Sequence, residues 1–397
     1  MDFLEGYRCG NCGRELPAGT AAGECPECAG PLLAVYDTGL LRRSVTREEF
    51  FERGDGVWRF RALLPSFGRS LSLGEGGTPL LESPRIARRA GCGKLWIKDE
   101  SLNPTGSFKA RGLAAAVSRA LELGAGTVAI PSAGNAGLAL AAYSAAAGIR
   151  AKVFMPSCTP PGFAGEAAAL GADVRTVAGI LPDAAAAMAD EGRGRGWVDL
   201  STFREPCRVE GKKTIAFEIE DGLEADTPDW IVFPTGGGTG VVAVWKAYGE
   251  LDSLGWLDGG RPRIAAVQSK GCAPLVEAFE AGADRAVPWI DPETCACGIR
   301  VPSSRADRQI LEALRESGGA AVAVTEEAIR EAALEMGASA GTFPSPEGAA
   351  ALAGLYELAG SGRIEAGHRV VVVNTAGWSR YRFMLDWAGG GGPRDVA

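Results

Sequence analysis

A lysine at the start of an expected helix is the residue in this chain best suited to chemistry. Lys109 follows two turn dipeptides, Asn103-Pro104 and Thr105-Gly106. Ser107 is placed to cap a helix over Ala110–Leu123, which puts the lysine in the first turn. There the positive end of the helix dipole and partial burial both disfavour an ammonium. A partly neutral lysine is a nucleophile able to form a Schiff base with an aldehyde cofactor, although the spacing alone also fits an ordinary surface lysine.

Composition narrows the classes of protein to consider. The chain has 397 residues, 46% hydrophobic and 23% charged, which suits a globular protein of two or three domains. A net charge of −8 and the lack of a long basic run argue against broad nucleic-acid binding. The first residues lack the basic and apolar regions of a secretory signal, and Gly137–Ile149 is too short to span a bilayer. We therefore expect a cytoplasmic protein that binds no membrane.

The chain contains a single histidine, His368. A metal site built from several histidines is excluded, and a histidine-based triad would have to use this residue. A solvated or capping histidine is the simpler interpretation. Acid–base chemistry must then come from lysines, carboxylates, hydroxyls or a cofactor, which strengthens the case for Lys109.

Four cysteines near the start have the spacing of a metal site. They are Cys9, Cys12, Cys25 and Cys28, in the pattern C-x2-C-x12-C-x2-C. Two such knuckles present four thiolates tetrahedrally and leave no open coordination position, so we expect a structural zinc ion. Two disulfides are the alternative, which a cytosolic location disfavours. The other six cysteines are expected to be buried, inert thiols, with the pair Cys295 and Cys297 a weak metal or redox signal.

Beyond this segment, short apolar runs alternate with helical patterns. The expected strands are Leu95–Lys98, Thr127–Ile130, Ala151–Met155, Asp173–Val177, Trp230–Phe233, Ile264–Gln268 and Arg369–Asn374. The expected helices are Thr46–Arg53, Ala110–Leu123, Ala136–Ala147, Phe163–Leu170, Pro182–Glu191, Thr214–Gly222, Val241–Leu254, Glu326–Glu335 and Pro346–Ala359. This alternation predicts parallel sheets covered by helices on both faces, in two α/β units. The Gly389–Gly392 run and the residues after it are expected to be a disordered tail.

Two further strand-to-helix loops have residues suited to a ligand. Residues 234–240 read Pro-Thr-Gly-Gly-Gly-Thr-Gly, and successive glycine N–H groups at a helix start can cradle a phosphate. Residues 131–137 read Pro-Ser-Ala-Gly-Asn-Ala-Gly, where the amide of Asn135 can face a ligand. A plain tight turn and a simple N-cap are the respective alternatives. All three loops occupy the strand-to-helix position at which open α/β sheets bind ligands, which favours one shared cleft.

Together these motifs resemble those of the threonine synthase family of pyridoxal-phosphate (PLP) enzymes, which has the tryptophan-synthase-β fold type. The matching segments, in family order, are 73–80 (LGEGGTPL), 98–109 (KDESLNPTGSFK), 132–137 (SAGNAG), 205–214 (EPCRVEGKKT), 234–240 (PTGGGTG), 272–274 (CAP) and 374–377 (NTAG). The resemblance implies PLP fold type II, an α/β architecture of two open, twisted parallel-sheet domains with a cofactor cleft between them, plus the N-terminal zinc ribbon. The expected boundaries are 1–35 for the ribbon, 36–113 with 221–397 for the large domain, and 114–220 for the small domain.

Residue roles carried over from the family are expectations of the same kind. Lys109 corresponds to the lysine that binds the cofactor and moves protons. The other implied cofactor contacts are Phe108, Asn135, Gly236, Gly237, Gly238, Thr239, Gly240 and Thr375. A hydroxyl such as that of Thr375, unlike a carboxylate, leaves the pyridine nitrogen largely unprotonated. The candidate contacts for a substrate phosphate are Thr78, Ser107, Ser132, Arg208 and Lys212.

The implied reaction converts O-phospho-L-homoserine and water to L-threonine and phosphate, in a homodimer active in threonine biosynthesis. The chain departs from the family at Ala110, where Asp is common, and at residues 374–380, which read Asn-Thr-Ala-Gly-Trp-Ser-Arg. A related enzyme of β-elimination or β-replacement, such as a serine/threonine dehydratase or a cysteate-synthase-like enzyme, is therefore the alternative. Arg208 and the Lys212-Lys213 pair favour a substrate with a second anion. A third interpretation is a non-catalytic binding protein whose ribbon recruits a partner, which the intact Lys109, Asn135 and Thr375 disfavour.

Overall fold

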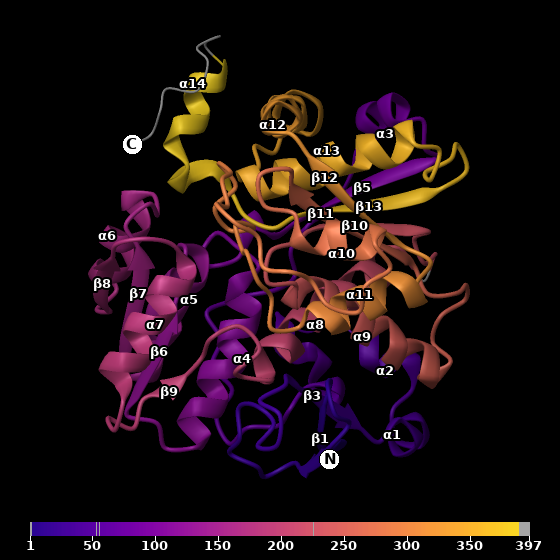
Figure 1. Cartoon of the computed structure of the whole chain (residues 1–397). Helices are drawn as coiled ribbons and strands as arrows, with labels where there is room; N and C mark the ends of the chain where they lie inside the picture. Colours follow the sequence, from indigo (N-terminus) through magenta and orange to yellow (C-terminus); the bar gives the residue numbers. More distant parts are fainter. Residues whose placement is uncertain (1, 53, 55, 225, 389–397) are drawn as a thin grey trace. The chain divides into compact units, whose positions relative to one another are not determined.

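The computed structural model describes residues 2–388 except 53, 55 and 225. The chain forms two compact units (Figure 1). The first comprises residues 1–77, 103–218 and 249–256, and the second comprises 78–102, 219–248 and 257–397. This division groups residues 36–77 with the ribbon and the smaller sheet, whereas the expected boundaries assigned them to the large domain. The domain boundaries stay a prediction. The expected tail after Gly389 lies outside the described residues.

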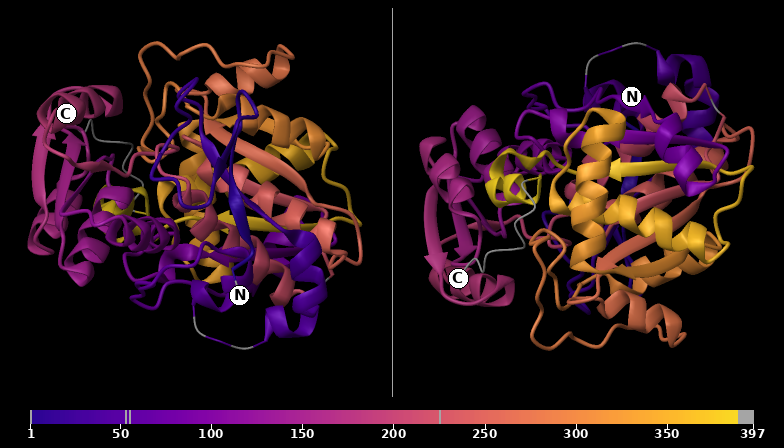
Figure 2. Two further views of the ribbon diagram at one scale, coloured as in Figure 1. Left: turned by 90° about the horizontal axis from the view of Figure 1, so that it is seen from below. Right: turned by 90° about the horizontal axis from the view of Figure 1, so that it is seen from above.

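The first unit opens with a small antiparallel sheet in the order β2-β1-β3. Its strands are β1 (Leu4–Cys9), β2 (Glu15–Pro17) and β3 (Leu32–Tyr36), drawn in indigo in Figure 2. Tyr7, Leu32 and Tyr36 are among the buried residues of this module. Two short helices follow, α1 (Thr38–Ser44) and α2 (Arg47–Phe51), the latter within the helical segment expected over 46–53. So small a sheet has little core of its own, which suits a module closed by a metal.

The same unit holds a parallel sheet in the order β8-β7-β6-β9. Its strands are β6 (Thr127–Pro131), β7 (Arg150–Pro156), β8 (Asp173–Val177) and β9 (Val198–Asp199). Its helices are α4 (Lys109–Glu122), α5 (Asn135–Ala147), α6 (Pro161–Ala169), α7 (Leu181–Gly192) and most of α8 (Cys207–Gly222). The central strand β6 is an almost continuous buried apolar run, as expected of a strand covered on both faces.

The second unit is built on a six-stranded sheet in the order β12-β11-β10-β13-β5-β4, parallel except for β4 (Figures 1 and 2). Its strands are β4 (Leu80–Glu82), β5 (Lys94–Asp99), β10 (Trp230–Pro234), β11 (Arg263–Ser269), β12 (Ala320–Val324) and β13 (Arg369–Asn374). Its helices are α3 (Pro84–Ala90), the first part of α9 (Thr239–Leu254), α10 (Pro274–Glu280), α11 (Asp307–Glu316), α12 (Glu326–Ala340), α13 (Pro346–Gly360) and α14 (Leu385–Ala388). Helix α13 lies against β10, β11 and β13, and α3 and α12 pack beside it.

All seven expected strands are present, and β8 and β13 have the expected ends. Several elements of the second unit were not predicted, among them β4, α3, α10, α14, β12 and α11. Strand β12 reads Ala-Ala-Val-Ala-Val, whose alanines favour helix, and it forms because it pairs with the buried strand β11. Helix α11 begins at Asp307, after an irregular segment without a capping pattern. Within the described residues, no helix is long and apolar enough to cross a membrane.

Candidate active site

Lys109 is the first residue of helix α4, so it lies in the first turn as the sequence predicted. The lysine is half-buried, whereas Phe108 and Ala110 on either side of it are buried. Its Nζ atom lies 4.0 Å from the centroid of the Phe108 ring. The amine therefore lies against an apolar ring at the start of a helix and is partly accessible to solvent.

The turn before Lys109 differs from the expected capping arrangement. Residue Phe108, not Ser107, occupies the N-cap, with a helical φ of −58° and no side-chain cap. The prediction that Ser107 caps the helix is wrong, because the chain already turns when the N–H of Ala110 donates to the carbonyl of Ser107 (3.2 Å). The hydroxyls of Ser107 and Thr105 are buried and have no protein partner. Buried polar groups without partners are rare, so these two hydroxyls mark a place for a ligand or water. The sequence analysis overlooked Thr105, which stands two residues before Ser107 in the same turn.

Helix α4 crosses α8 at a point where both helices carry glycine. A Cβ atom on Gly112 would lie 2.7 Å from the Nζ of Lys212 and 2.7 Å from the carbonyl of Arg208. One on Gly211 would lie 2.1 Å from the carbonyl oxygen of Arg111. Larger side chains would separate the backbones, so the two glycines bring Lys212 next to the turn that carries Lys109.

Arg208 and Lys212, both expected to contact a substrate anion, lie on α8 and are almost completely buried. The guanidinium of Arg208 donates to the carbonyl of Leu200 (2.6 Å), its Nε has no partner, and it forms no ion pair within the described residues. The Nζ of Lys212 donates to the carbonyl of Arg208 (3.0 Å) and lies 5.7 Å from the Phe108 ring centroid.

Burial affects the charges of these two groups differently. Burial lowers the pKa of Arg208 to about 10, so the guanidinium stays charged at neutral pH. Burial holds the pKa of Lys212 well below its usual range, and the nearby positive charges of Arg208 and Lys109 lower it further. Arg208 is thus a permanent buried cation, whereas the amine of Lys212 is driven towards its neutral form.

The loop before α5 places Asn135 as the first helical residue. The N-cap is Gly134, with φ of 130°, so the alternative in which Asn135 is a simple N-cap is wrong. The hydroxyl of Ser132 accepts the N–H groups of Gly134 (3.1 Å) and Gly137 (2.8 Å) and thereby shapes the loop. A Cβ on Gly134 would lie 2.9 Å from the Phe163 ring, so the loop requires glycine there.

The triple-glycine loop lies in the second unit, after β10 and at the start of α9. Gly238 has φ of +77°, and its Cβ would lie 2.0 Å from Ile310 Cδ1, so only glycine suits this position. Within the described part of the chain, the N–H groups of residues 236–240 donate to no protein acceptor outside the helix. Successive unused N–H donors at a helix start form an anion site.

Two threonines of the second unit belong to the expected site. Thr375 follows β13, whose last residue, Asn374, donates to Asp99 (2.9 Å). This bond ties the end of β13 to the end of β5. The hydroxyl of Thr78 donates to the buried carboxylate of Glu100 (2.5 Å), so its proton is already used.

The four N-terminal cysteines come together as expected. Their sulfur atoms all lie within 4.8 Å of one another, with 3.4 Å between Cys9 and Cys28 and 3.7 Å between Cys12 and Cys25. A tetrahedral zinc ion with Zn–S bonds of about 2.3 Å requires sulfur separations of about 3.8 Å, so the donor set fits zinc. No disulfide is formed, and no other such ligand group occurs among the described residues.

Replacing Cys12 with serine is expected to lower the zinc content from about one ion per chain towards zero, because the site loses one of four thiolates. Elemental analysis of protein produced with added zinc measures this change. The matched control is Cys158→Ser, which alters an exposed cysteine outside the ribbon. Full zinc retention in the Cys12 variant would contradict the assignment.

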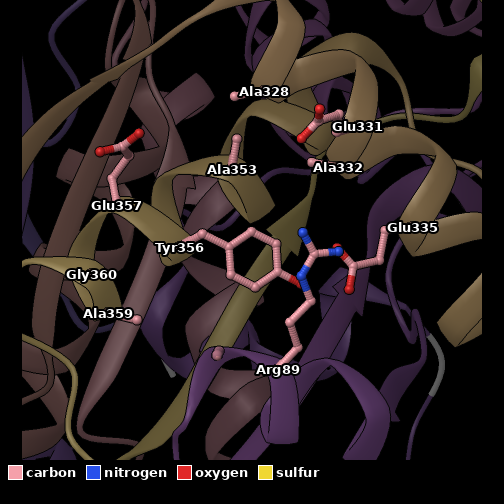
Figure 3. A pocket seen from close by; sticks show the side chains of 11 residues that line it. Arg89, Ala328, Glu331, Ala332, Glu335, Ala353, Tyr356, Glu357, Ala359 and Gly360 are labelled. Atoms are coloured by element: carbon pink, nitrogen blue, oxygen red, sulfur yellow. The ribbon is translucent and has the colours of Figure 1, made fainter.

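A hollow of about 470 Å³ lies elsewhere in the second unit, among helices α3, α12 and α13 (Figure 3). Arg89 stacks 4.8 Å from the Tyr356 ring centroid and pairs with Glu335 (2.6 Å). Glu331 and Glu357 also line the hollow, and none of the expected site residues does. With its arginine paired and further carboxylates present, the hollow does not suit a phosphorylated cofactor.

Comparisons with known proteins identify the family of the chain. A family model described as "Pyridoxal-phosphate dependent enzyme" matches residues 71–376. Threonine synthase from Methanosarcina acetivorans is 37% identical over 369 residues, covering 93% of this chain and 90% of that protein. Threonine synthase from Methanocaldococcus jannaschii is 37% identical over 371 residues, covering 93% and 91%. The structure of diaminopropionate ammonia lyase from Escherichia coli has a TM-score of 0.70 and 19% identity, covers 81% of this chain and 89% of that chain, and shows a shared fold.

The fold and the matched region define a PLP-dependent enzyme, and specifically a lyase. The chain belongs to the threonine synthase family. Its own residues fit the cofactor: the half-buried amine of Lys109 suits an aldehyde, and the unused N–H groups of residues 236–240 suit a phosphate. His368 takes no part in this set, because its Nδ1 accepts the N–H of Glu365 (2.9 Å) as a local cap.

Proposed function

We propose that this protein converts O-phospho-L-homoserine and water to L-threonine and phosphate. The observation that carries the proposal is the charge of Arg208, a buried guanidinium that forms no ion pair with any residue the structure describes. Lys212 links it to the turn of Lys109. A buried cation is costly, and an incoming phosphate dianion would offset part of that cost through charge-assisted hydrogen bonds. The relatives carry the name threonine synthase, which supports threonine as the product.

In this proposal Lys109 would bind the cofactor aldehyde, remove the substrate Cα proton and shuttle the proton lost from Cβ, which Cγ gains after phosphate leaves. PLP, when bound, supplies the electron sink that acidifies the proton at Cα. Arg208 holds the phosphate that leaves from Cγ, and water adds at Cβ. One amine therefore acts as nucleophile, base and acid in turn.

The remaining assignments are proposals on the same basis. Phe108 and Asn135 would contact the cofactor ring, the loop of residues 236–240 would bind its phosphate, and Thr375 would face the pyridine nitrogen. Among the proposed substrate contacts, the hydroxyl of Ser107 is unused, which favours it as a donor. Thr78, Ser132 and Lys212 complete the proposed set. We also propose a structural zinc in the ribbon, a homodimer and a cytoplasmic location.

A second candidate is a related PLP-dependent β-elimination or β-replacement enzyme. The observation that favours it is Trp378, which stands shortly after Thr375 where small residues are usual in the family. Its ring centroid lies 5.8 Å from that of Phe343. Offering O-phosphohomoserine, O-phosphoserine and threonine in parallel separates the two functions. Phosphate release with threonine formed from the first supports our proposal. Phosphate release from the second alone, or 2-ketobutyrate from the third, would refute it.

The phosphate role of Arg208 makes a separate prediction. In Arg208→Met, KM for O-phosphohomoserine is expected to rise about 100-fold, because a charge-assisted hydrogen-bonded pair contributes about 1.5–3 kcal/mol. Lys212→Met is expected to change KM less, because burial lowers the pKa of this amine and so disfavours its charged form. Steady-state kinetics measure both, with the exposed Arg175→Met as the control. Equal effects of the Arg208 and Arg175 variants would contradict the assignment.

A further inference from the structure

The ribbon loop between the two cysteine pairs contacts an arginine of helix α4. Arg119 is 7% exposed, and its Nη2 donates to the carbonyls of Thr20 (2.8 Å) and Ala22 (3.1 Å). The loop also lies directly on the segment before α8, since a Cβ on Gly23 would be 2.1 Å from the carbonyl oxygen of Arg204. The position of this loop therefore bears on the residues just before α8.

The same arginine connects the loop to Arg208. Its Nη1 pairs with Glu205 (3.2 Å), and both side chains are buried. The other oxygen of Glu205 accepts the backbone N–H of Arg208 (2.9 Å). A buried carboxylate held by two such donors has little freedom to move, so this chain of contacts fixes where α8 begins.

The ribbon sheet supports the other side of α8. Tyr36 donates to Glu210 (2.8 Å), and Lys213 pairs with Glu210 (2.7 Å) and lies 4.3 Å from the Tyr36 ring centroid. Lys212, one residue away, contacts Phe108 instead. Helix α8 thus turns one side towards the ribbon and another towards the Lys109 turn.

The loop depends on the thiolate cluster for its own position. It begins after β2 and ends at Cys25, so two of the four sulfur ligands bracket it in the chain. The ribbon has three short strands and little core, and such modules depend on their metal to fold. Losing the metal would release the two carbonyls that Arg119 binds.

We propose that metal occupancy of the four-cysteine ribbon sets the affinity of Arg208 for phosphate, through Arg119 and Glu205 as positioning residues. The inference rests on the proposed function, in which Arg208 binds the substrate phosphate. The ribbon then holds Arg208 in position, and its metal occupancy regulates anion binding. Zinc loss weakens that binding without any change in the PLP-binding residues.

A double-mutant cycle tests the coupling with inorganic phosphate as the probe, by calorimetry on the full-length, PLP-loaded protein. Removing zinc with a chelator, or replacing Arg119 with methionine in the zinc-loaded protein, is expected to weaken binding about 10-fold. Both changes together are expected to weaken it no further than either alone. Additive losses, or an unaltered affinity in the zinc-loaded Arg119→Met protein, would overturn the proposal.

Amide hydrogen exchange provides a readout independent of function. Residues 199–208 are expected to exchange faster after zinc removal in the wild type, with no further change in Arg119→Met. If phosphate fails to bind the wild-type protein while this exchange response persists, the substrate proposal is wrong and the coupling stands. If the exchange rates of residues 199–208 do not change when zinc is removed, the proposed coupling is wrong, whatever the substrate is.

Discussion

Lys109→Ala is expected to abolish covalent attachment of PLP and to lower turnover by at least about 10³-fold, because one amine supplies the nucleophile and the proton-transfer group. The half-buried position at the start of α4, against the Phe108 ring, is what makes this amine available to an aldehyde. Borohydride reduction followed by peptide mapping measures attachment, and loss of the absorption of bound cofactor follows in the same sample.

Two further variants make this result specific. Lys109→Arg keeps a cation but cannot condense with an aldehyde, so it is expected to be as inactive as the alanine variant. Lys152→Ala alters another partly exposed lysine of the same unit and should leave attachment intact. Normal covalent attachment of PLP in Lys109→Ala would mean that another amine reacts with the cofactor, and would contradict the assignment of Lys109.

Arg111→Met is expected to destabilise the protein by about 3–5 kcal/mol, since it leaves a buried carboxylate without its cation. Arg111 is fully buried two residues after Lys109 and pairs with Glu218 of α8 at 2.6 Å. The same guanidinium donates to Thr214 (2.9 Å), and Glu218 accepts the N–H of Gly77 (2.8 Å). Urea unfolding measures the free energy.

The double variant Arg111→Met/Glu218→Met distinguishes a buried-charge effect from lost packing. Because removing both partners leaves no unpaired charge, it is expected to recover more than half of the lost stability. Equal instability of the single and double variants would mean that the pair acts through shape and not through charge.

Much of the local structure could be predicted from sequence. Strands β8 and β13 have the expected ends, and Lys109 begins its helix as expected, because apolar runs and turn dipeptides report on nearby residues. Strand β12 was missed because its alanines carry no strand signal, and only pairing with β11 makes it a strand. The prediction that Ser107 caps the helix was wrong because Phe108 already has helical geometry. No residue type in this turn indicates that geometry.

The contacts that hold the candidate-site residues in place could not be predicted from the sequence. Arg111 and Glu218 are 107 positions apart, and nothing in their spacing predicts a buried pair. The same holds for Arg119, which connects the ribbon carbonyls to Glu205. Such contacts arise only when distant segments pack together.

By itself, the sequence determined the spacing of the four N-terminal cysteines, the family motifs and the lysine that begins α4, since all of these depend on residue types at short separations. Only the tertiary structure decided the charges of the two residues that we propose to bind an anion. In the sequence Arg208 and Lys212 are two equivalent cations, yet burial leaves the first charged and drives the second towards its neutral form. The reason is physical: the free energy of a charge depends on the solvent and the neighbours that folding assembles around it, and not on its place in the chain.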